Sequence, residues 1–405
     1  MAWATREAKA AKDRVSDRVA IGVLTQMFPP ALVDAAVAEA GVSQKRRRDL
    51  PSRLMVYFTL AMWLWREHGY EEVLRQLTDG MVWAGVGDDD LGDADSDVPW
   101  SGSITKARQR LGPAPVKLMF REVAGPVGTV ETAGVFWRGM RLTAVDGFTL
   151  DVPDSDANRE EFGGPSDGPF PQVRVVAHAE VGTRALIEVA FGSYDTGEKT
   201  LVRDLCGSMK PGMLTIFDRG FAGYELWEKF ASTGADLLVR MPSTFTLPVK
   251  KALSDGSYLS VLRFRGRRHI TVRVIEYTVI TTDTDADGAP REVSELFCLA
   301  TTLLDPQEAP IEEIPGLYAQ RWEAETVIRA VKTDLRGGIQ IRLRSHSADG
   351  VRQEVWSLLC VYQALSRLIT YAAGHHQLDP DRISFTRARN IARRSVNWTG
   401  GSFSP

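Results

Sequence analysis

Cysteine is scarce in this sequence. Only three cysteines, Cys206, Cys298 and Cys360, occur among its 405 residues, and none has the short spacing of a zinc-ligand pair. This scarcity excludes a small secreted domain held together by disulfides. We therefore expect the three cysteines to be reduced core residues in a cytoplasmic protein. The length of the chain allows two or three domains.

Long apolar segments are also missing. The longest, Leu54 to Trp65, is too short to cross a bilayer as a helix. The stretch Met1 to Arg18 is charged and has no apolar centre, so it does not resemble a secretory signal. The sequence therefore predicts no membrane partner.

No charge of one sign dominates. Lysine and arginine total 49, against 52 aspartates and glutamates, which leaves a net charge of −3. Nucleic-acid affinity comes from neutralising phosphates, so a binder this neutral must segregate its basic residues. Local basic concentrations, each of which could also be a solvated face, lie at 45–48, 106–110, 263–268, 336–344 and 382–394. The acidic segment 88–97 lacks the residue pattern of a calcium loop, so we expect it to be a solvated loop.

What the sequence does contain is a run of functional side chains at helical spacing. Tyr318, Arg321, Glu325 and Lys332 fall within an arc of roughly 60° on one helix that turns about 100° per residue. An adjoining apolar sector would face the core. A carboxylate, two cations and a phenol along one edge suit a metal ion and phosphates. The ordinary alternative is a solvated face with minor ion pairs.

Two further carboxylates end apolar runs that are typical of strands. Asp146 follows Arg141-Leu-Thr-Ala-Val, and Asp218 follows Met213-Leu-Thr-Ile-Phe, with a glycine close behind each acid. Strand ends at the rim of an α/β sheet are where such folds place ligands. Taken singly, each Asp could instead form a turn.

The order of elements around these acids is more specific. Strand-like segments follow Asp146 at 172–179 and 184–191, then a helix near 199–209, the Asp218 strand, a helix at 224–233 and a strand at 236–241. Three strands, then helix, strand, helix and strand is the ribonuclease H-like order. It would bring Asp146, Asp218 and Glu325 to one rim.

With these residues in place, the chain resembles a DDE transposase of the bacterial insertion-sequence group that carries the Tyr-Arg-Glu-Lys signature. The spacing of the signature residues fits that group, as do Asp218-Arg-Gly-Phe and Val145-Asp-Gly around its two other acids. Ser103 to Gly112 is similar to the group's N-terminal domain. The resemblance covers about residues 20 to 395.

The resemblance implies specific roles. Asp146, Asp218 and Glu325 would hold two Mg²⁺ ions, for which Mn²⁺ can substitute, and catalyse phosphodiester hydrolysis and strand joining. Tyr318, Arg321 and Lys332 would grip the DNA backbone near the cleaved transposon end, where a hairpin forms in this group. Trp322 would stack on that hairpin or, alternatively, pack beside the helix.

Further DNA contacts follow from the resemblance and the charge pattern. Lys106, Arg108 and Arg110 would lie in the domain that recognises the terminal inverted repeats. Some members trap a flipped base with a tryptophan in a β insertion, but residues 242–299 contain none, which leaves Phe297 as the base-stacking candidate. The partners implied are transposon-end and target double-stranded DNA, with a homodimer when two ends are paired.

The predicted fold is α/β, a ribonuclease H-like domain with a β-rich insertion after an all-helical domain. The expected parts are a helical DNA-binding domain at 1–120, catalytic segments at 127–242 and 300–375, the insertion at 243–299 and a basic tail at 376–405. Two other functions stay open: a non-catalytic DNA-binding derivative, and a ribonuclease H-like nuclease outside transposition.

Overall fold

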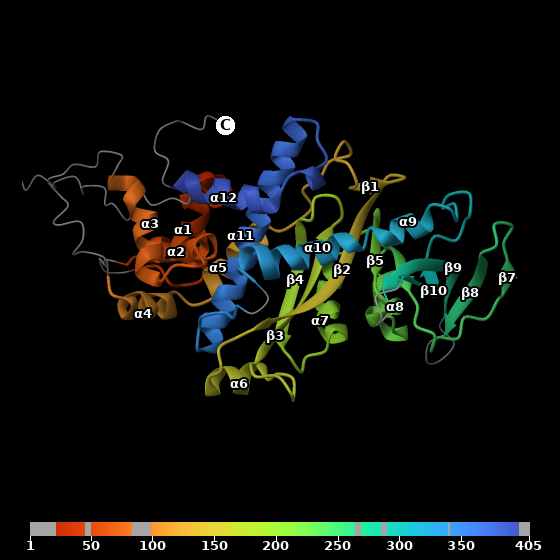
Figure 1. Ribbon diagram of the computed structural model, residues 1–405, viewed down its shortest axis with the longest axis horizontal. Helices are drawn as coiled ribbons and strands as arrows, with labels where there is room; N and C mark the ends of the chain where they lie inside the picture. Colours follow the sequence, from red (N-terminus) through yellow and green to blue (C-terminus); the bar gives the residue numbers. More distant parts are fainter. Residues whose placement is uncertain are drawn as a thin grey trace, which may run out of the picture. The chain divides into compact units, whose positions relative to one another are not determined.

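The chain forms two compact units in the computed structural model (Figure 1). The structure describes residues 22–44, 50–82, 99–263, 269–284, 290–338 and 341–396. One unit comprises residues 1–123, 352–364 and 386–405, and the other comprises 124–351 and 365–385. The predicted basic cluster 45–48, most of cluster 263–268 and the acidic segment 88–97 lie outside the described residues.

The first unit is helical, as predicted. Its helices are α1 (Pro30–Glu39), α2 (Ser52–Leu64), α3 (Tyr70–Val82), α4 (Ser101–Leu111), α5 (Ala114–Val123), part of α11 (Ala348–His375) and most of α12 (Phe385–Val396). The central helix α2 is buried on all sides except at Arg53. A 3₁₀ turn, η2 (Gly22–Gln26), precedes α1, which begins at Pro30 because proline suits a helix start.

Later parts of the chain complete this unit. The Trp63 indole donates to the Glu354 carbonyl at 3.1 Å, and the Gln353 side chain donates to the Gly112 carbonyl at 2.7 Å. The Gln363 side chain donates to the carbonyl of Val123 at 3.1 Å. A domain limited to residues 1–120 would therefore leave out part of its own core.

The second unit is built on one ten-stranded sheet. Its strands are β1 (Phe136–Trp137), β2 (Met140–Asp151), β3 (Gln172–Glu180), β4 (Leu186–Ser193), β5 (Met213–Phe217), β6 (Asp236–Arg240), β7 (Lys251–Ala252), β8 (Tyr258–Arg263), β9 (His269–Thr284) and β10 (Pro290–Thr301). The order is β4-β3-β2-β5-β6-β10-β9-β8-β7, with β1 beside β2.

The first five strands of that order have the ribonuclease H-like arrangement. Strands β2, β3 and β4 are antiparallel neighbours, whereas β5 and β6 run parallel to β2. The β-rich insertion does not stand apart, because β10 pairs antiparallel with β6 and extends the same sheet.

Helices cover both faces of the sheet (Figure 1). On one face, α7 (Glu198–Leu205) and α8 (Tyr224–Ala231) pack through Leu201 and Trp227. On the other, α9 (Ile314–Ala319) and α10 (Trp322–Arg329) pack through Leu317 and Ala324. A short helix, α6 (Asp156–Phe162), follows β2, and its N-cap Ser155 accepts a hydrogen bond from the Asn158 amide.

The predicted helix carrying Tyr318 to Lys332 is segmented. Helix α9 contains Tyr318, a tight turn at Gln320 and Arg321 leads into α10 with Glu325, and a π-helical turn, η5 (Ala330–Leu335), carries Lys332. The 60° arc assumed an uninterrupted α-helix, so it does not describe Lys332. π-helical turns inside α-helices occur frequently at functional sites.

Two expectations concern the chain as a whole. All three cysteines are free, with Cys206 and Cys360 buried. Within the ranges that the structure describes, no helix combines the length and apolarity needed to span a membrane.

Candidate active site

Two of the predicted acids lie next to each other on the sheet. Val145 pairs with Phe217 in the last register pair of the parallel strands β2 and β5, so Asp146 and Asp218 follow side by side. Residues 144 and 216, two before each acid, belong to the core beneath α9 and α10. Because strand side chains alternate, both carboxylates point to that same face.

The third acid approaches from the helix above. Arg321 joins it to the sheet: its Nη1 is 3.3 Å from Asp146 Oδ2 and its Nη2 is 2.6 Å from Glu325 Oε1. The guanidinium is 14% exposed. Burial lowers the pKa of Arg321, but the Glu325 hydrogen bond and nearby anions raise it overall, so the side chain remains a cation.

Tyr318 contacts the remaining acid. Its hydroxyl donates to Asp218 Oδ1 at 3.3 Å. Burial and then the Asp218 carboxylate raise the pKa of Tyr318 well above its ordinary value, so the phenol stays a hydrogen-bond donor. Tyr318 and Arg321 thus each donate to one acid of the adjacent pair.

The electrostatics of the acids reflect their proximity. Burial raises the pKa of Asp146 to about 6, and the Glu325 and Asp218 carboxylates add to this rise. The Gly147 amide, which donates to Asp146 Oδ1 at 2.8 Å, and Arg321 act in the opposite direction. Two carboxylates that raise the pKa of a third form, together with it, a region that favours a cation.

The side chains as they stand do not form a ligand set. Across the described ranges, no three His, Cys, Asp or Glu side chains are arranged to share one metal ion. Arg321 accounts for this at the acids, because its guanidinium lies between Asp146 and Glu325. The donor chemistry nevertheless fits divalent ions, since hard cations prefer carboxylate oxygens, and a cationic group already stands at this point.

A fourth carboxylate explains the glycine after Asp146. Gly147 faces the opposite side of the sheet, where a Cβ on it would lie 2.6 Å from the carboxyl carbon of Glu198. Glu198 begins α7 and pairs with Arg174 at 3.4 Å. The Glu198 carboxyl group therefore lies directly behind the strand end that carries Asp146.

Two other signature-helix residues are placed differently. Trp322 is 63% exposed, so it does not pack in the core, the alternative considered for it, and its ring is open to stacking. Lys332 is half-buried on η5, where burial and then Arg336 lower its pKa while Asp151 opposes them. Lys332 thus lies near Asp151, the last residue of β2, which follows Asp146 by five residues.

Phe297 is already flanked by other side chains. It stacks on Tyr277 with centroids 5.3 Å apart, and the Arg240 guanidinium carbon lies 3.9 Å from its ring centroid. Tyr318 meets it edge-on at 6.0 Å. A base could stack on Phe297 only after one of these neighbours moved.

The predicted contacts on α4 divide into two kinds. Lys106 and Arg110 are exposed. Arg108 is 5% exposed, donates to the Gln353 side chain at 3.0 Å and pairs with Glu354 at 3.6 Å. A buried guanidinium with these partners cannot reach DNA, which corrects the expectation for Arg108. It holds α4 to α11 within the first unit.

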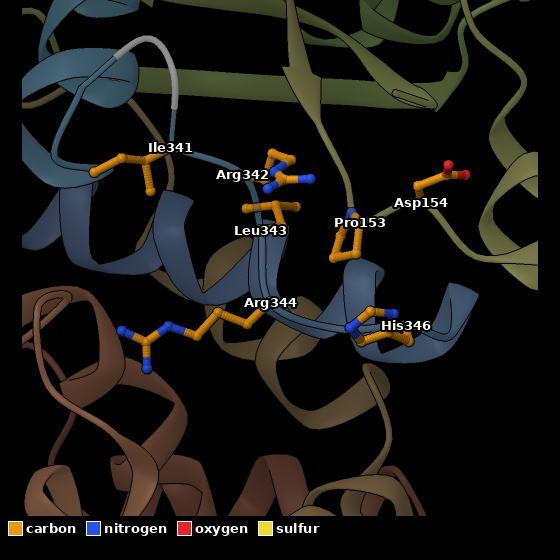
Figure 2. A pocket seen from close by; sticks show the side chains of 7 residues that line it. All are labelled: Pro153, Asp154, Ile341, Arg342, Leu343, Arg344 and His346. Carbon is orange, nitrogen blue, oxygen red and sulfur yellow. The ribbon is translucent and has the colours of Figure 1, made fainter. Parts of the chain in front are cut away.

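A basic cavity of about 570 Å³ lies beyond the end of β2. It is lined by Pro153, Asp154, Ile341, Arg342, Leu343, Arg344 and His346, and none of the three acids borders it. The Leu343 amide donates to the Asp151 carbonyl at 3.0 Å, which fixes this segment beside β2. Figure 2 shows Arg342 and His346 on the side of Pro153, whereas Arg344 extends away.

The fold and this carboxylate rim define a class of protein. Residues 137–364, more than half of the chain, match the family described as "Transposase DDE domain", and the chain belongs to that family. It is therefore a DNA-cleaving and strand-transferring enzyme. Residues 18–121 match a second family, "Insertion element 4 transposase N-terminal".

Particular relatives are consistent with this assignment. The chain is 25% identical over 397 residues to "Transposase InsG for insertion sequence element IS4" of Escherichia coli (strain K12), covering 92% of this chain and 82% of that protein. It is 26% identical over 186 residues to "Putative transposase InsZ" of the same organism, covering 45% of this chain and 58% of that protein. A piggyBac transposase synaptic complex with hairpin DNA aligns at 10% identity and a TM-score of 0.49 over 93% of this chain and 79% of that one, which adds nothing to the assignment.

Proposed function

We propose that this transposase binds terminal inverted repeats, cleaves the transposon ends and joins them to target DNA with two Mg²⁺ ions, for which Mn²⁺ can substitute. The observation that carries the proposal is the adjacent pair Asp146 and Asp218 on the sheet face that α10 covers, where Arg321 bridges Asp146 to Glu325. Bound between these carboxylates, the ions would supply Lewis acidity for in-line displacement at a phosphodiester.

The chain's own residues would prepare that step by exchanging partners. Arg321 neutralises Asp146 and Glu325 in the resting site, so its fork becomes available for a DNA phosphate once cations satisfy those acids. Tyr318 is a protonated donor beside Asp218. Lys332 contributes a point charge from η5, which follows α10.

Contacts to the DNA end would come from exposed groups. Lys106 and Arg110 on α4 are accessible for inverted-repeat backbone contacts, while Trp322 offers an open ring for stacking on an unpaired base. The cavity lined by Arg342 and His346 suits a further backbone phosphate. Binding two ends at once would require a homodimer, and action on cellular DNA would place the enzyme in the cytoplasm.

The decisive experiment removes each acid. Asp146→Ala, Asp218→Ala and Glu325→Ala should each abolish cleavage of inverted-repeat DNA with Mg²⁺ while folding and end binding persist. Glu225→Ala, which removes an exposed carboxylate of α8, is the matched control and should cleave normally. Glu325→Cys should regain cleavage with thiophilic Mn²⁺ but not with Mg²⁺, since a thiolate is a softer ligand.

Each alternative has its own result. An acid variant that keeps normal Mg²⁺-dependent cleavage would remove that acid from the site. A wild-type protein that binds ends and never cleaves them would be a non-catalytic DNA-binding derivative. Preference for an RNA–DNA hybrid over duplex ends would indicate a ribonuclease H-like nuclease. Hairpin-ended products, resolved on denaturing gels, would establish the hairpin route.

A further inference from the structure

A cation continues the row formed by the two strand acids. Phe217 of β5 pairs with Val239 of β6 in the last register pair of these parallel strands, so Arg240 follows beside Asp218. Leu238, two residues earlier, belongs to the core beneath α9 and α10, so Arg240 points to the same face as both acids. Adjacent strands lie about 4.8 Å apart, which puts Arg240 roughly 10 Å from Asp146 across the row.

The Arg240 guanidinium contacts an aromatic ring and a carboxylate. It lies over the Phe297 ring, 3.9 Å from the centroid, and pairs with Glu295. The Arg240 side chain is 16% exposed and Glu295 is 53% exposed, so only the carboxylate end of this ion pair is well solvated. Stacking limits the rotamers of Arg240, and the exposed Glu295 carboxylate can turn away so that a phosphate takes its place. The same side chain acts electrostatically on Tyr318, which touches Asp218.

Building on the function proposed above, we propose that Arg240 binds a backbone phosphate of the transposon end next to the one that is cut. A planar guanidinium offers two parallel donors to phosphate oxygens, and Phe297 presents it without the entropic cost of a free side chain. On this arrangement Phe297 orients a phosphate-binding arginine instead of stacking a base. The sequence carries a weak signal for Arg240, a charged residue ending an apolar strand, as Asp218 does.

A purely structural role is the competing explanation. In that case Arg240 only covers Phe297 and pairs with Glu295, and removing it changes stability without changing any contact to DNA. The two roles differ in a measurable way, because a phosphate contact depends on the charge of one phosphate and on salt. Losing one such contact should reduce the slope of log affinity against log salt by about 0.7 to 0.9.

The experiment combines protein and DNA changes. Arg240→Ala and Arg240→Lys are compared with wild type and with Arg203→Ala, a control that removes an exposed, ion-paired arginine from α7. End-DNA affinity is measured over a salt series without cleavage, and cleavage is measured with single methylphosphonates placed at successive positions around the cut. Thermal unfolding of each variant reports folding.

We expect Arg240→Ala to weaken end binding about tenfold and to flatten the salt slope, with partial recovery in Arg240→Lys. One neutral methylphosphonate should impair wild type yet leave Arg240→Ala no worse than it already is. If every methylphosphonate impairs wild type and Arg240→Ala by equal factors, Arg240 does not bind the phosphate. Cleavage of the end DNA by wild type would still support the proposed function, so the two proposals can fail separately. If Arg240→Ala does not fold, the same comparison is made with Arg240→Lys.

Discussion

Arg321 is the residue whose surroundings say most about how the site works. The helical spacing predicted a phosphate-binding arginine, and the structure instead shows it between two acids. Both descriptions hold if the guanidinium balances the carboxylates until cations arrive. Such an exchange couples metal binding to the release of a DNA-binding group.

We predict that Arg321→Ala keeps metal binding and loses positioning of the DNA end. Without the guanidinium the three carboxylates repel one another, so Mn²⁺ should raise the melting temperature of the variant more than that of wild type. Joining should fall by at least about 100-fold, and more than first nicking, because misplacement alone has such effects. Arg321→Lys should recover part of the activity. Combined loss of nicking and of metal-induced stabilisation would make Arg321 a structural partner of the acids.

Gly147 is a second residue with a specific physical requirement. We predict that Gly147→Ala lowers the free energy of unfolding by about 1 kcal/mol, the low end for an added methyl group, since its Cβ would push aside the Glu198 carboxyl group, the end of a flexible side chain. Cleavage should fall as the strand end carrying Asp146 shifts. Urea unfolding and cleavage assays measure both effects.

The matched control is Gly220→Ala in the segment after Asp218, where an added Cβ meets nothing within 4 Å. That variant should stay within about 0.5 kcal/mol of wild type. The double variant Gly147→Ala with Glu198→Ala should recover stability. A double variant as unstable as Gly147→Ala would show that Glu198 is not the obstacle.

Among the elements, helix α10 depends on a charged cluster away from the acids. Arg184, in the turn after β3, has a φ of 59° and pairs with Glu323 of α10 and, at 2.7 Å, with Asp381 of η6 (Pro380–Arg382). The cluster thus links the helix that carries Glu325 to the β3–β4 turn. Two carboxylates share this guanidinium, which makes the cluster sensitive to pH.

We predict that the cluster loses stability as pH rises from about 4 through 6. Burial raises the pKa of Asp381 to about 6; Arg184 lowers it, while Glu323 and Asp379 raise it. A folded pKa above the ordinary value means that folding favours the protonated acid, so that contribution disappears above the folded pKa. The urea midpoint of wild type should therefore fall more between pH 4.5 and 7 than that of Asp381→Asn. Glu225→Gln is the control, and identical pH profiles for wild type and Asp381→Asn would contradict the prediction.

At the level of the whole chain, the first unit is discontinuous in sequence. Residues 352–364 and 386–405 belong to it together with residues 1–123. The buried contacts of Trp63 and Arg108 with residues 353 and 354 depend on that return of the chain. The match to a separate N-terminal family ends at residue 121, before these segments.

We predict that a fragment of residues 1–123 does not fold cooperatively, because its core lacks α11. A fusion of residues 1–123 to residues 348–396 through a Gly/Ser linker should restore a cooperative transition. Circular dichroism during heating distinguishes the two. A sharp transition in the short fragment alone would show that the N-terminal helices are self-sufficient, and inverted-repeat recognition could then be assayed on that fragment.

Much of this protein follows from local patterns in its sequence. Apolar runs ending in an acid and the spacing from Tyr318 to Lys332 predicted the two acid-bearing strands, the site helix and the ribonuclease H-like order, because periodicity and turn chemistry act over a few residues. Strand register depends on pairing between distant segments, so only the tertiary structure placed Arg240 beside Asp218. Burial also depends on contacts between distant segments. The sequence predicted DNA contacts for Lys106, Arg108 and Arg110 alike, but packing against α11 buries Arg108. Likewise, the guanidinium of Arg321 pairs with Asp146 across 175 residues, a contact that no local pattern encodes.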